Sequence, residues 1–494
     1  MSLELNSLII KIIEAGYQLS PEAFKFLQKF PKDSAEKMVT NAIEEARKNP
    51  DRLIFDQSFV EAIYNQRQSK PNRIKSKTQE ILSHKITTNI QYFSNEKVVP
   101  ASDVDGFTDY FRSRYEKLNS ILRKRIDARE SVTFERVGNL PLKSQVKTIG
   151  MVTQKRTRGS RLFLEMEDLD RSYTFLVSDP DVVRNGLQIQ QDQVICVDSV
   201  KFTEDLLIVN NIIWPDIPEK TPSRSQDPVC AALLSDIHVG SKFFREDLFY
   251  RFIEWLSLES EERSHRELAS RIKYLVIAGD LIDGVGVYPD QIDELSISTI
   301  SEQYGKAVKL LKEIPDYIEI IIIPGNHDAV RKSIPQPPIP KKYCSELHED
   351  PRIHLYENPC QLSLHGVDFL ICHGKSLDDI LSKTPGHDFQ YPSKGMELLL
   401  RARHLAPSYG LSTPIAPESF DRLVIERVPD LFHMGHIHIH ETKKYKGTTI
   451  VASGTFQDQT PFQNRMKITP TPGVVSIFDL QTHKLSKLDL RDYE

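Results

Sequence analysis

The chain has 494 residues, with 64 lysines and arginines against 69 aspartates and glutamates and a formal net charge of -5. At ~150 residues per domain, this length predicts about three domains. Hydrophobic residues make up 39% of the chain, enough for sizeable cores, which excludes wholesale disorder. Because the chain is not basic overall, nucleic-acid binding has to come from local patches, a motif or a partner chain.

The sequence predicts a protein of the reducing cytoplasm with no membrane association. No apolar run reaches the ~20 residues of a membrane helix. The N-terminal residues are typical of an amphipathic helix rather than of a signal peptide. The 5 cysteines are an odd number, are scattered and form no CxxC pair: Cys196, Cys230, Cys344, Cys360 and Cys372. This pattern argues against a disulfide framework and against a zinc ribbon.

Residues 1–65 are predicted to form a small helical domain for docking or spacing. Their first apolar residues follow the i, i+3, i+4 spacing of a helix, and Ser20 before Pro21 is typical of a helix start. Four residues loosely match a box that binds the sliding clamp: Gln57, Val60, Ile63 and Tyr64. The same spacing occurs on a helix face that packs in a core, and the core interpretation is favoured over the clamp as a partner.

Residues 66–106 are predicted to be a basic linker. The stretch from Gln66 to Lys77 contains no acid and five basic residues: Arg67, Lys70, Arg73, Lys75 and Lys77. Such a run can follow a DNA phosphate backbone. Most charge runs are only solvated, however, and the solvated interpretation is favoured here.

Residues 107–220 are predicted to form a helix followed by an OB-fold barrel. Apolar side chains recur on one side of a helix over residues 107–126. Three strands, a helix and two more strands are then expected: 146–152, 162–166, 173–177, helix 180–185, 193–200 and 206–213. That order is typical of an OB fold, which often binds single strands. A basic run lies at its first hairpin: Lys155, Arg156, Arg158 and Arg161. A barrel that only holds protein partners is an equally supported alternative.

Residues 226–494 follow a proline-rich boundary and change to apolar strands that alternate with helices, which predicts a layered α/β domain. Ligands of such sheets lie beyond the carboxyl ends of the strands. Five apolar segments end there in polar residues: AALLSDIHVG, YLVIAGDLIDG, EIIIIPGNHDAV, FLICHGKS and DLFHMGHIHIH. The five segments are therefore expected to point polar groups into one crevice.

Seven side chains of these segments suit two divalent ions: Asp236, His238, Asp280, Asn326, His373, His436 and His438. Oxygen ligands combined with imidazole suit manganese, iron or zinc better than calcium. Asp-x-His and His-x-His spacing places both side chains on the same side of an extended segment. A lone Asp or His at a strand end is usually a solvated cap, but five such segments in sequence argue against chance. Asp280 is the natural bridge between two ions, and Asp283 and Asp328 are expected to support the ligands.

The motifs D-x-H, G-D, G-N-H-D, H-G and G-H-x-H, in this order, resemble those of the calcineurin-like metallophosphoesterase superfamily. The resemblance implies two ligand sets that share Asp280: Asp236, His238 and His438 for one ion, and Asn326, His373 and His436 for the other. It also implies that His327 is the catalytic histidine near the leaving oxygen and that Asp328 holds it. The C-terminal domain is accordingly expected to be a calcineurin-like phosphoesterase.

From about residue 140 to the end, the chain is similar to the small subunits of archaeal family-D DNA polymerases, which resemble the B-subunits of eukaryotic replicative polymerases. The similarity rests on the barrel before the phosphoesterase motifs and on three segments: GNHDAVRKSIPQP, CHGKSLDDI and GTFQDQTPFQNRMKITPTPG. It implies a 3′→5′ exonuclease that proofreads DNA in a heterodimer, or higher complex, with a large catalytic subunit. Manganese is the first expectation for the two ions, with magnesium, iron or zinc as alternatives.

Two other functions remain open at this point. The chain could be a metallophosphoesterase of another substrate class, such as a protein phosphatase or a cyclic-nucleotide phosphodiesterase. It could also be a non-catalytic scaffold, although the complete ligand set argues against this. Arg331 and Lys375 lie just beyond two motif loops, where a phosphate clamp and a plain surface role are equally supported.

Overall fold

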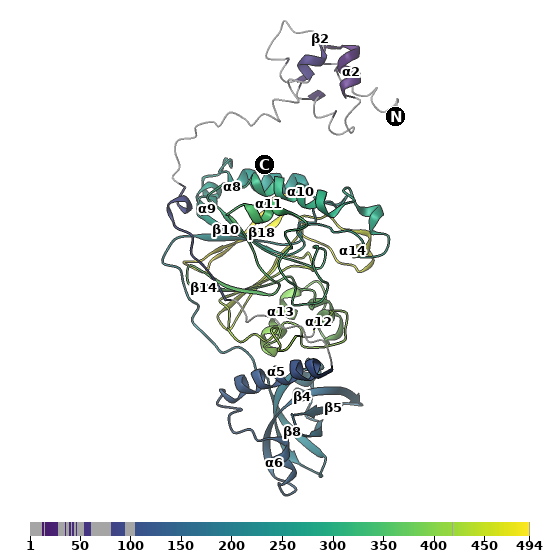
Figure 1. Cartoon of the computed structure of the whole chain (residues 1–494), viewed down its shortest axis with the longest axis vertical. Helices are drawn as coiled ribbons and strands as arrows, with labels where there is room; N and C mark the ends of the chain where they lie inside the picture. Colours follow the sequence, from purple (N-terminus) through teal and green to yellow (C-terminus); the bar gives the residue numbers. More distant parts are fainter. Residues whose placement is uncertain are drawn as a thin grey trace. The chain divides into compact units, whose positions relative to one another are not determined.

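The protein divides into two compact units, Met1–Glu80 and Ile81–Glu494 (Figure 1). The computed structural model describes these residues: 12–13, 15–27, 35, 39–40, 42–43, 46, 54–60, 81–93, 104–416 and 418–493. Within this described part, no helix combines the length and the apolar character needed to cross a membrane. All five cysteines are described, and each is a free thiol.

The first unit has a small apolar core of its own. Its described elements are β1 (Gln18–Leu19), α2 (Pro21–Leu27) and β2 (Ile54–Phe55), and the two strands pair in parallel. The Ser20 hydroxyl accepts a hydrogen bond from the Ala23 amide at 3.1 Å, so α2 begins where the sequence predicts a helix start. The core residues are Ile12, Ala23, Leu27, Ala35, Val39, Ala42, Ile43, Ala46, Phe55 and Val60.

The residues of the clamp-binding box fall partly inside this core. Val60 is only 2% exposed and packs in the apolar cluster, as the core interpretation requires. Ile63 and Tyr64 lie outside the described residues, as does the basic run from Gln66 to Lys77. The clamp therefore stays a prediction without structural support.

The predicted linker, residues 66–106, is wrong in one part. The chain forms the 3-10 helix η1 (Ser83–Lys85) and the strand β3 (Ile90–Tyr92), and β3 pairs antiparallel with a strand of the second unit, β13 (Cys360–Leu364). Ile90 and Tyr92 pack against the apolar cluster between the sheets of that unit. These contacts explain why the segment is an edge strand rather than a free linker.

A closed five-stranded barrel opens the second unit, after the helices α5 (Val104–Arg123) and α6 (Phe134–Gly138). Its elements are β4 (Gln145–Arg158), β5 (Arg161–Glu167), β6 (Ser172–Val177), α7 (Pro180–Leu187), β7 (Val194–Lys201) and β8 (Leu206–Ile213). The strands close in the order β4-β5-β6-β8-β7. The predicted succession of three strands, a helix and two strands is thus confirmed.

The rest of the unit holds two six-stranded sheets. The first has the order β12-β11-β10-β9-β18-β19, and the second has the order β16-β17-β15-β14-β13-β3. The strands of the first are β9 (Cys230–Leu234), β10 (Ile272–Ala278), β11 (Glu319–Ile323), β12 (Ile353–Leu355), β18 (Val474–Asp479) and β19 (Leu485–Asp489). The others in the second are β14 (Val367–Cys372), β15 (Leu431–Met434), β16 (Glu441–Tyr445) and β17 (Thr448–Ala452).

Helices cover the outer faces of both sheets. They are α8 (Glu246–Leu256), α9 (Arg263–Ala269), α10 (Ile300–Lys312), α11 (Ser345–Glu349), α12 (Leu377–Lys383) and α13 (Pro392–Ala402). The short helix α14 (Pro461–Arg465) and the 3-10 helix η2 (Gln291–Glu294) lie in the loops, where Gln463 and Gln291 bond to His438 and Asp283. Figure 1 shows α8 and α10 beside the sheet of β10, and α12 and α13 between the sheet of β14 and the barrel. The predicted layered α/β arrangement is confirmed at this level.

The run of isoleucines in β11 is buried on both faces of the sheet. Ile320 and Ile322 pack in the core under the outer helices, whereas Ile321 and Ile323 pack in the core between the two sheets. Successive side chains of a strand point to opposite faces. A central strand that is covered on both sides therefore has to be apolar at every position.

A buried ion pair joins α5 to the α/β domain. The Arg114 Nε donates to the Asp421 Oδ2 at 2.7 Å, and both side chains are fully buried. The same carboxylate lies 2.8 Å from the His404 Nε2, and the Arg114 Nη2 donates to the Tyr110 hydroxyl at 3.2 Å. Neighbouring His404 and Arg114 hold the pKa of Asp421 below its ordinary value, although burial acts the other way.

Replacing Arg114 by leucine is expected to destabilise the second unit by about 3 kcal/mol, because the Asp421 charge is left buried without its partner. Arg112 is a matched control on the same helix, since its side chain is 53% exposed and lies 3.8 Å from Asp109. Arg112→Leu is expected to cost less than about 1 kcal/mol. Urea denaturation followed by the fluorescence of Trp214 and Trp255 measures both. Equal midpoints for the two variants would refute the role given to Arg114.

Candidate two-metal centre

The carboxyl ends of five strands bring the predicted ligands together. β9 is followed by Asp236 and His238, β10 by Asp280, and β11 by Asn326, while His373 follows β14 and His436 follows β15. The strands β9, β10 and β11 are parallel to one another, and β14 is parallel to β15. Parallel strands end at the same edge of their sheet, and the two sheets pack against each other, so residues far apart in the sequence meet beyond these two edges.

The ligand atoms form two clusters that meet at Asp280. In one cluster, atoms of Asp236, His238 and His438 lie within 4.8 Å of one another, and in the other, atoms of Asp280, His373 and His436 do so. Asn326 belongs to the second, because its Oδ1 lies 3.0 Å from the His373 Nε2. The Asp280 Oδ2 is 3.2 Å from the His373 Nε2 and 3.8 Å from the His238 Nε2. Asp280 thus occupies the position of a bridge, and all seven predicted residues are brought together.

The backbone at this edge is strained in a way that the sequence does not reveal. Five of the seven residues have a positive φ: Asp236 (53°), His238 (54°), Asp280 (51°), His436 (71°) and His438 (65°). This left-handed conformation costs a residue other than glycine about 1–3 kcal/mol. Such strain gathers at functional sites, where the surrounding structure holds it in place for a ligand.

The charges of the site suit a cation. Burial alone would raise the pKa of Asp280, but the neighbouring His373 imidazolium outweighs it and holds the pKa below its ordinary value. Burial acts against the charged form of His238 and His373 too, yet the neighbouring carboxylates raise their pKa values to about 10 and about 9. Protons on the His238 and His373 rings therefore balance the negative charge of the carboxylates. A divalent ion can take the place of these protons.

Two further observations favour metal ligands over ordinary ion pairs. The Asp236 Oδ1 is buried and has no hydrogen-bond partner among the described residues. The His238 Nε2 and the His438 Nε2 face each other at 3.1 Å, where two nitrogens compete for one proton. A cation between carboxylates and imidazoles satisfies all of these atoms, so the donor set fits divalent ions.

Polar side chains behind the site orient its imidazole rings, as is common at metal sites. The Asp283 Oδ1 lies 2.9 Å from the His238 Nδ1, which agrees with the supporting role predicted for Asp283. The Gln463 Nε2 lies 2.8 Å from the His438 Nδ1, and the Asp378 Oδ1 lies 3.1 Å from the His436 Nε2. Gln463 and Asp378 were missed at the sequence level, because single polar residues in a loop or short helix carry no spacing signal.

His327 lies at the rim of the site and is only 16% exposed. Its Nδ1 donates to the Asp283 carbonyl at 2.7 Å, and its backbone amide donates to the Asp280 Oδ1 at 2.7 Å. The first bond fixes the ring so that the Nε2 is the atom free to exchange a proton with a substrate. Burial lowers the pKa of His327 to about 4, so the ring is neutral at pH 7.

The predicted contact between Asp328 and His327 is wrong. The Asp328 carboxylate instead accepts hydrogen bonds from the Gly325 amide at 2.8 Å, the Leu281 amide at 3.3 Å and the Tyr304 hydroxyl at 3.2 Å. Burial raises its pKa to about 6. Asp328 therefore ties two motif loops together, and the Asp283 carbonyl is what holds His327.

The residues considered as phosphate clamps are engaged within the protein. Arg331 lies 2.6 Å from Glu418 and also donates to the Pro335 carbonyl, while Lys375 donates to Asp378 at 2.7 Å. The sequence pattern did not single out Lys332, whose Nζ donates to the Asn326 carbonyl at 2.5 Å. Lys332 is thus held against a predicted ligand residue, with most of its capacity to donate still available.

Gly325 is a sensitive point of the site, because a Cβ at this position would collide with the Asp280 carboxylate. Gly325→Ala is expected to displace Asp280 and to weaken manganese binding by about 10- to 100-fold. Gly305 on α10 is the matched control, since a Cβ there meets no atom within 4 Å. Calorimetric titration with manganese measures both variants. Wild-type affinity in Gly325→Ala would contradict the place given to Asp280.

A β-barrel followed by a layered α/β domain with a candidate metal site is the class of protein that the fold and the site define, and comparison with known sequences shows which family has these features. The family of the B subunits of DNA polymerases alpha and epsilon matches residues 232–443, which contain all seven predicted ligands. A solved archaeal phosphodiesterase aligns with 53% of this chain and 99% of its own at 12% identity, with a TM-score of 0.28, too low to support an argument.

Close relatives then identify the particular family. The DNA polymerase II small subunit of Archaeoglobus fulgidus is 36% identical over 476 residues, which are 95% of this chain and 94% of the relative. That of Thermoplasma acidophilum is 35% identical over 487 residues, covering 98% and 92%. The chain belongs to the family of archaeal DNA polymerase II (family-D) small subunits. It matches 62% of the length of the Pyrococcus horikoshii relative, at 40% identity over 388 residues.

Proposed function

We propose that this chain is a metal-dependent 3′→5′ exonuclease that acts in a heterodimer, or a larger complex, with a large catalytic DNA polymerase subunit and removes mispaired 3′ ends. The observation that carries the proposal is the pair of ligand clusters that meet at Asp280, beyond the carboxyl ends of strands from both sheets. Membership of a polymerase small-subunit family favours DNA over other phosphoesters as the substrate.

The proposed metals are two divalent ions, with manganese as the first choice. Asp236, His238 and His438 would hold one ion; Asn326, His373 and His436 would hold the other. When bound, such ions polarise a phosphodiester and activate water. Asp280 would contribute to both ion sites. The backbone amide of His327 donates to the Asp280 carboxylate, which links Asp280 to the rim of the site.

His327 is proposed to act on the leaving oxygen. Hydrolysis breaks the bond between phosphorus and the 3′ oxygen, the oxygen of water joins the phosphorus, and the 3′ oxygen takes a proton. Since the His327 Nδ1 is committed to the Asp283 carbonyl, the Nε2 is the atom that faces the substrate. The negative charge of a bound phosphate favours the protonated ring and so raises its pKa from about 4.

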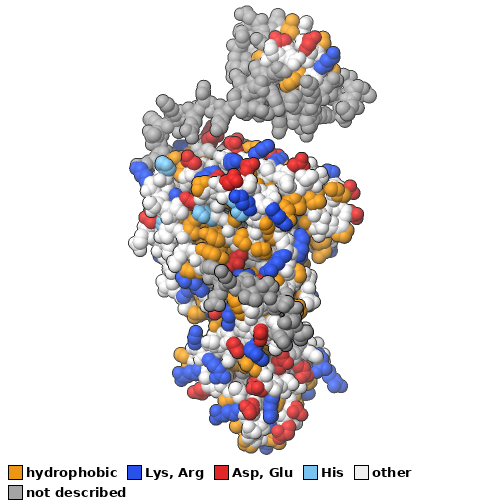
Figure 2. Space-filling model, viewed as in Figure 1, with side chains coloured by type: hydrophobic (Ala, Val, Ile, Leu, Met, Phe, Trp, Pro, Cys, Tyr) orange, Lys and Arg blue, Asp and Glu red, His pale blue; other side chains and the backbone are white. Residues whose placement is uncertain are grey.

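The barrel contributes less to this proposal than the sequence predicts. In its basic run, Lys155 donates to the carbonyls of Leu187 and Ile189 at 2.9 and 2.6 Å, and Arg156 lies 2.6 Å from Glu165. Arg158 and Arg161 are the exposed members that remain for phosphate contact. On the face seen in Figure 2, cationic side chains are interspersed with acidic and apolar ones over the barrel and the larger domain.

The proposal is tested by incubating a primer-template that has a mismatched 3′ end with manganese and the full chain, alone and with the large subunit. Stepwise shortening from the 3′ end, faster on the mismatched than on the paired primer, is the expected result. Hydrolysis of a phosphopeptide but not of DNA would favour another phosphoesterase class. No hydrolysis in any condition, with manganese shown to be bound, would favour a scaffold.

A further inference from the structure

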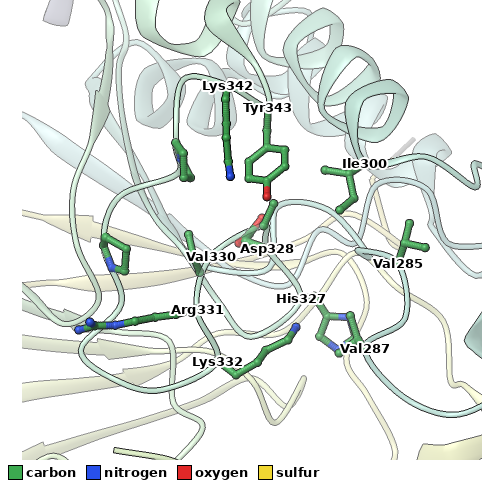
Figure 3. A pocket seen from close by; sticks show the side chains of 13 residues that line it. Val285, Val287, Ile300, His327, Asp328, Val330, Arg331, Lys332, Lys342 and Tyr343 are labelled. Carbon is green, nitrogen blue, oxygen red and sulfur yellow. The ribbon is translucent and has the colours of Figure 1, made fainter. Parts of the chain in front are cut away.

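A cavity of about 460 Å³ opens beside the candidate catalytic histidine. One side of it is the segment from His327 to Lys332, another comes from the loop between β10 and α10, and a third is formed by residues around Tyr343. Figure 3 shows His327 and Lys332 at one side, with Lys342 and Tyr343 extending inwards from the opposite side. A volume of this size falls within the range of small-ligand sites, about 300–1,000 Å³.

The walls combine apolar surface with positive charge. Val285, Val287, Ile300 and Val330 line the cavity together with the ring of Tyr343. Lys332 and Lys342 are exposed and also line it, and the Lys342 Nζ lies 4.7 Å from the centre of the Tyr343 ring. Apolar and aromatic walls with a few placed cations suit a base whose neighbouring phosphates are charged.

The acidic charge near the cavity is already compensated. Among the described residues that line it, Asp328 is the only acid, and its carboxylate accepts from two backbone amides and from the Tyr304 hydroxyl. Arg331 also lines the cavity, but its guanidinium is paired with Glu418 at 2.6 Å. The charges left to meet a ligand are thus those of Lys332 and Lys342, which favour an anionic ligand.

We propose that this cavity receives the nucleoside next to the 3′ end of the DNA strand, with its base against Tyr343 and Val330 and its 5′ phosphate near Lys342. The proposal rests on the proposed exonuclease function. In that reaction the leaving oxygen is the 3′ oxygen of the nucleoside next to the end. His327 is the residue proposed to meet this oxygen, and the cavity begins at His327. The terminal nucleotide then lies on the other side of the cleaved bond.

An abasic substrate tests the proposal in the unchanged protein. Single-stranded oligonucleotides carry a tetrahydrofuran residue at the terminal position, at the next position or six positions away, and the full chain with manganese removes the first nucleotide. The abasic residue next to the end is expected to lower kcat/KM by about 10-fold, the effect of losing one stacked base. An abasic residue six positions from the 3′ end is expected to leave kcat/KM unchanged.

Two cavity variants with matched controls extend the test. Tyr343→Ala is expected to lower kcat/KM on normal DNA by about 10-fold and to remove the penalty for the abasic residue. Lys342→Ala is expected to raise KM and to reduce the salt dependence of log KM by about 0.7, one phosphate contact on a single strand. The controls are Tyr250→Ala, 45% exposed on α8, and Lys309→Ala, exposed on α10, and both are expected to leave all rates unchanged.

The outcomes separate this inference from the proposed function. If the wild type shortens DNA equally fast with and without a base next to the 3′ end, the cavity assignment is overturned and the exonuclease stands. If the wild type does not shorten DNA but hydrolyses bis(p-nitrophenyl) phosphate with manganese, the proposed substrate is wrong, and the assignment with it. Should Tyr343→Ala fail to fold, the abasic comparison in the wild type decides alone.

Discussion

Replacing Asp280 by asparagine is expected to lower metal-dependent hydrolysis of DNA by about 10³-fold or more, because this carboxylate faces both ligand clusters. Its Oδ2 lies 3.2 Å from the His373 Nε2 and 3.8 Å from the His238 Nε2. The amide keeps the shape but removes one negative charge from a fully buried position between two cationic sites. Bound manganese is therefore expected to fall in parallel with the rate.

The measurement pairs hydrolysis rates with the manganese content of the dialysed protein. Asp290→Asn, in the exposed loop after β10, removes the same charge outside the site and is expected to change neither quantity. Asp280→Asn that keeps two manganese ions and a rate within 10-fold of the wild type would show that Asp280 does not bridge. A melting temperature near that of the wild type, measured without metal, excludes unfolding as the cause.

Replacing His327 by alanine is expected to lower DNA hydrolysis by about 10²–10⁴-fold, the usual contribution of a general acid. Manganese content should stay at the wild-type level, since the backbone amide of residue 327 still donates to the Asp280 Oδ1. This separates the variant from Asp280→Asn, which loses both activity and metal. His387→Ala, in the loop between α12 and α13, is the control without a role at the site.

The leaving group provides a sharper test of His327. The 3′ oxygen of DNA needs a proton to leave, whereas p-nitrophenolate is stable without one. His327→Ala is therefore expected to lose less than about 10-fold on bis(p-nitrophenyl) phosphate while it loses far more on DNA. Equal losses on the two substrates would place His327 in substrate binding or metal retention instead.

The convergence of the seven proposed ligands could be predicted from the sequence because its signal is local. Each apolar run is followed within a few residues by Asp, Asn or His, and parallel strands end at a common edge. Asp236 and His373 are 137 positions apart and follow β9 and β14, which belong to different sheets. The rule places each residue at the edge of its own sheet, and the packing of the two sheets brings them to one site. The elements of the barrel were predictable for a similar reason, since their succession along the chain follows from short-range alternation and turns.

Features that depend on long-range contacts could not be predicted. Strand β3 has only three residues, with Gln91 between Ile90 and Tyr92, which is too short for a strand signal, and it pairs with β13. The positive φ of Asp236 and His438 could not be read from residue type, because Asp and His adopt this conformation more often than most residues but still only in a minority of cases. Asp328 follows His327 directly in the sequence, but its side chain turns to the Gly325 amide, which adjacency alone does not reveal.

Anomalous diffraction at the manganese edge, on crystals of the full chain grown with manganese, tests the central claim most directly. We expect two peaks, one among Asp236, His238 and His438 and one among Asn326, His373 and His436, with Asp280 contacting both. Crystals of Asp280→Asn grown in the same way should lose at least one peak. Wild-type crystals with no manganese in either cluster, from protein that hydrolyses DNA, would contradict a two-metal centre at this sheet edge.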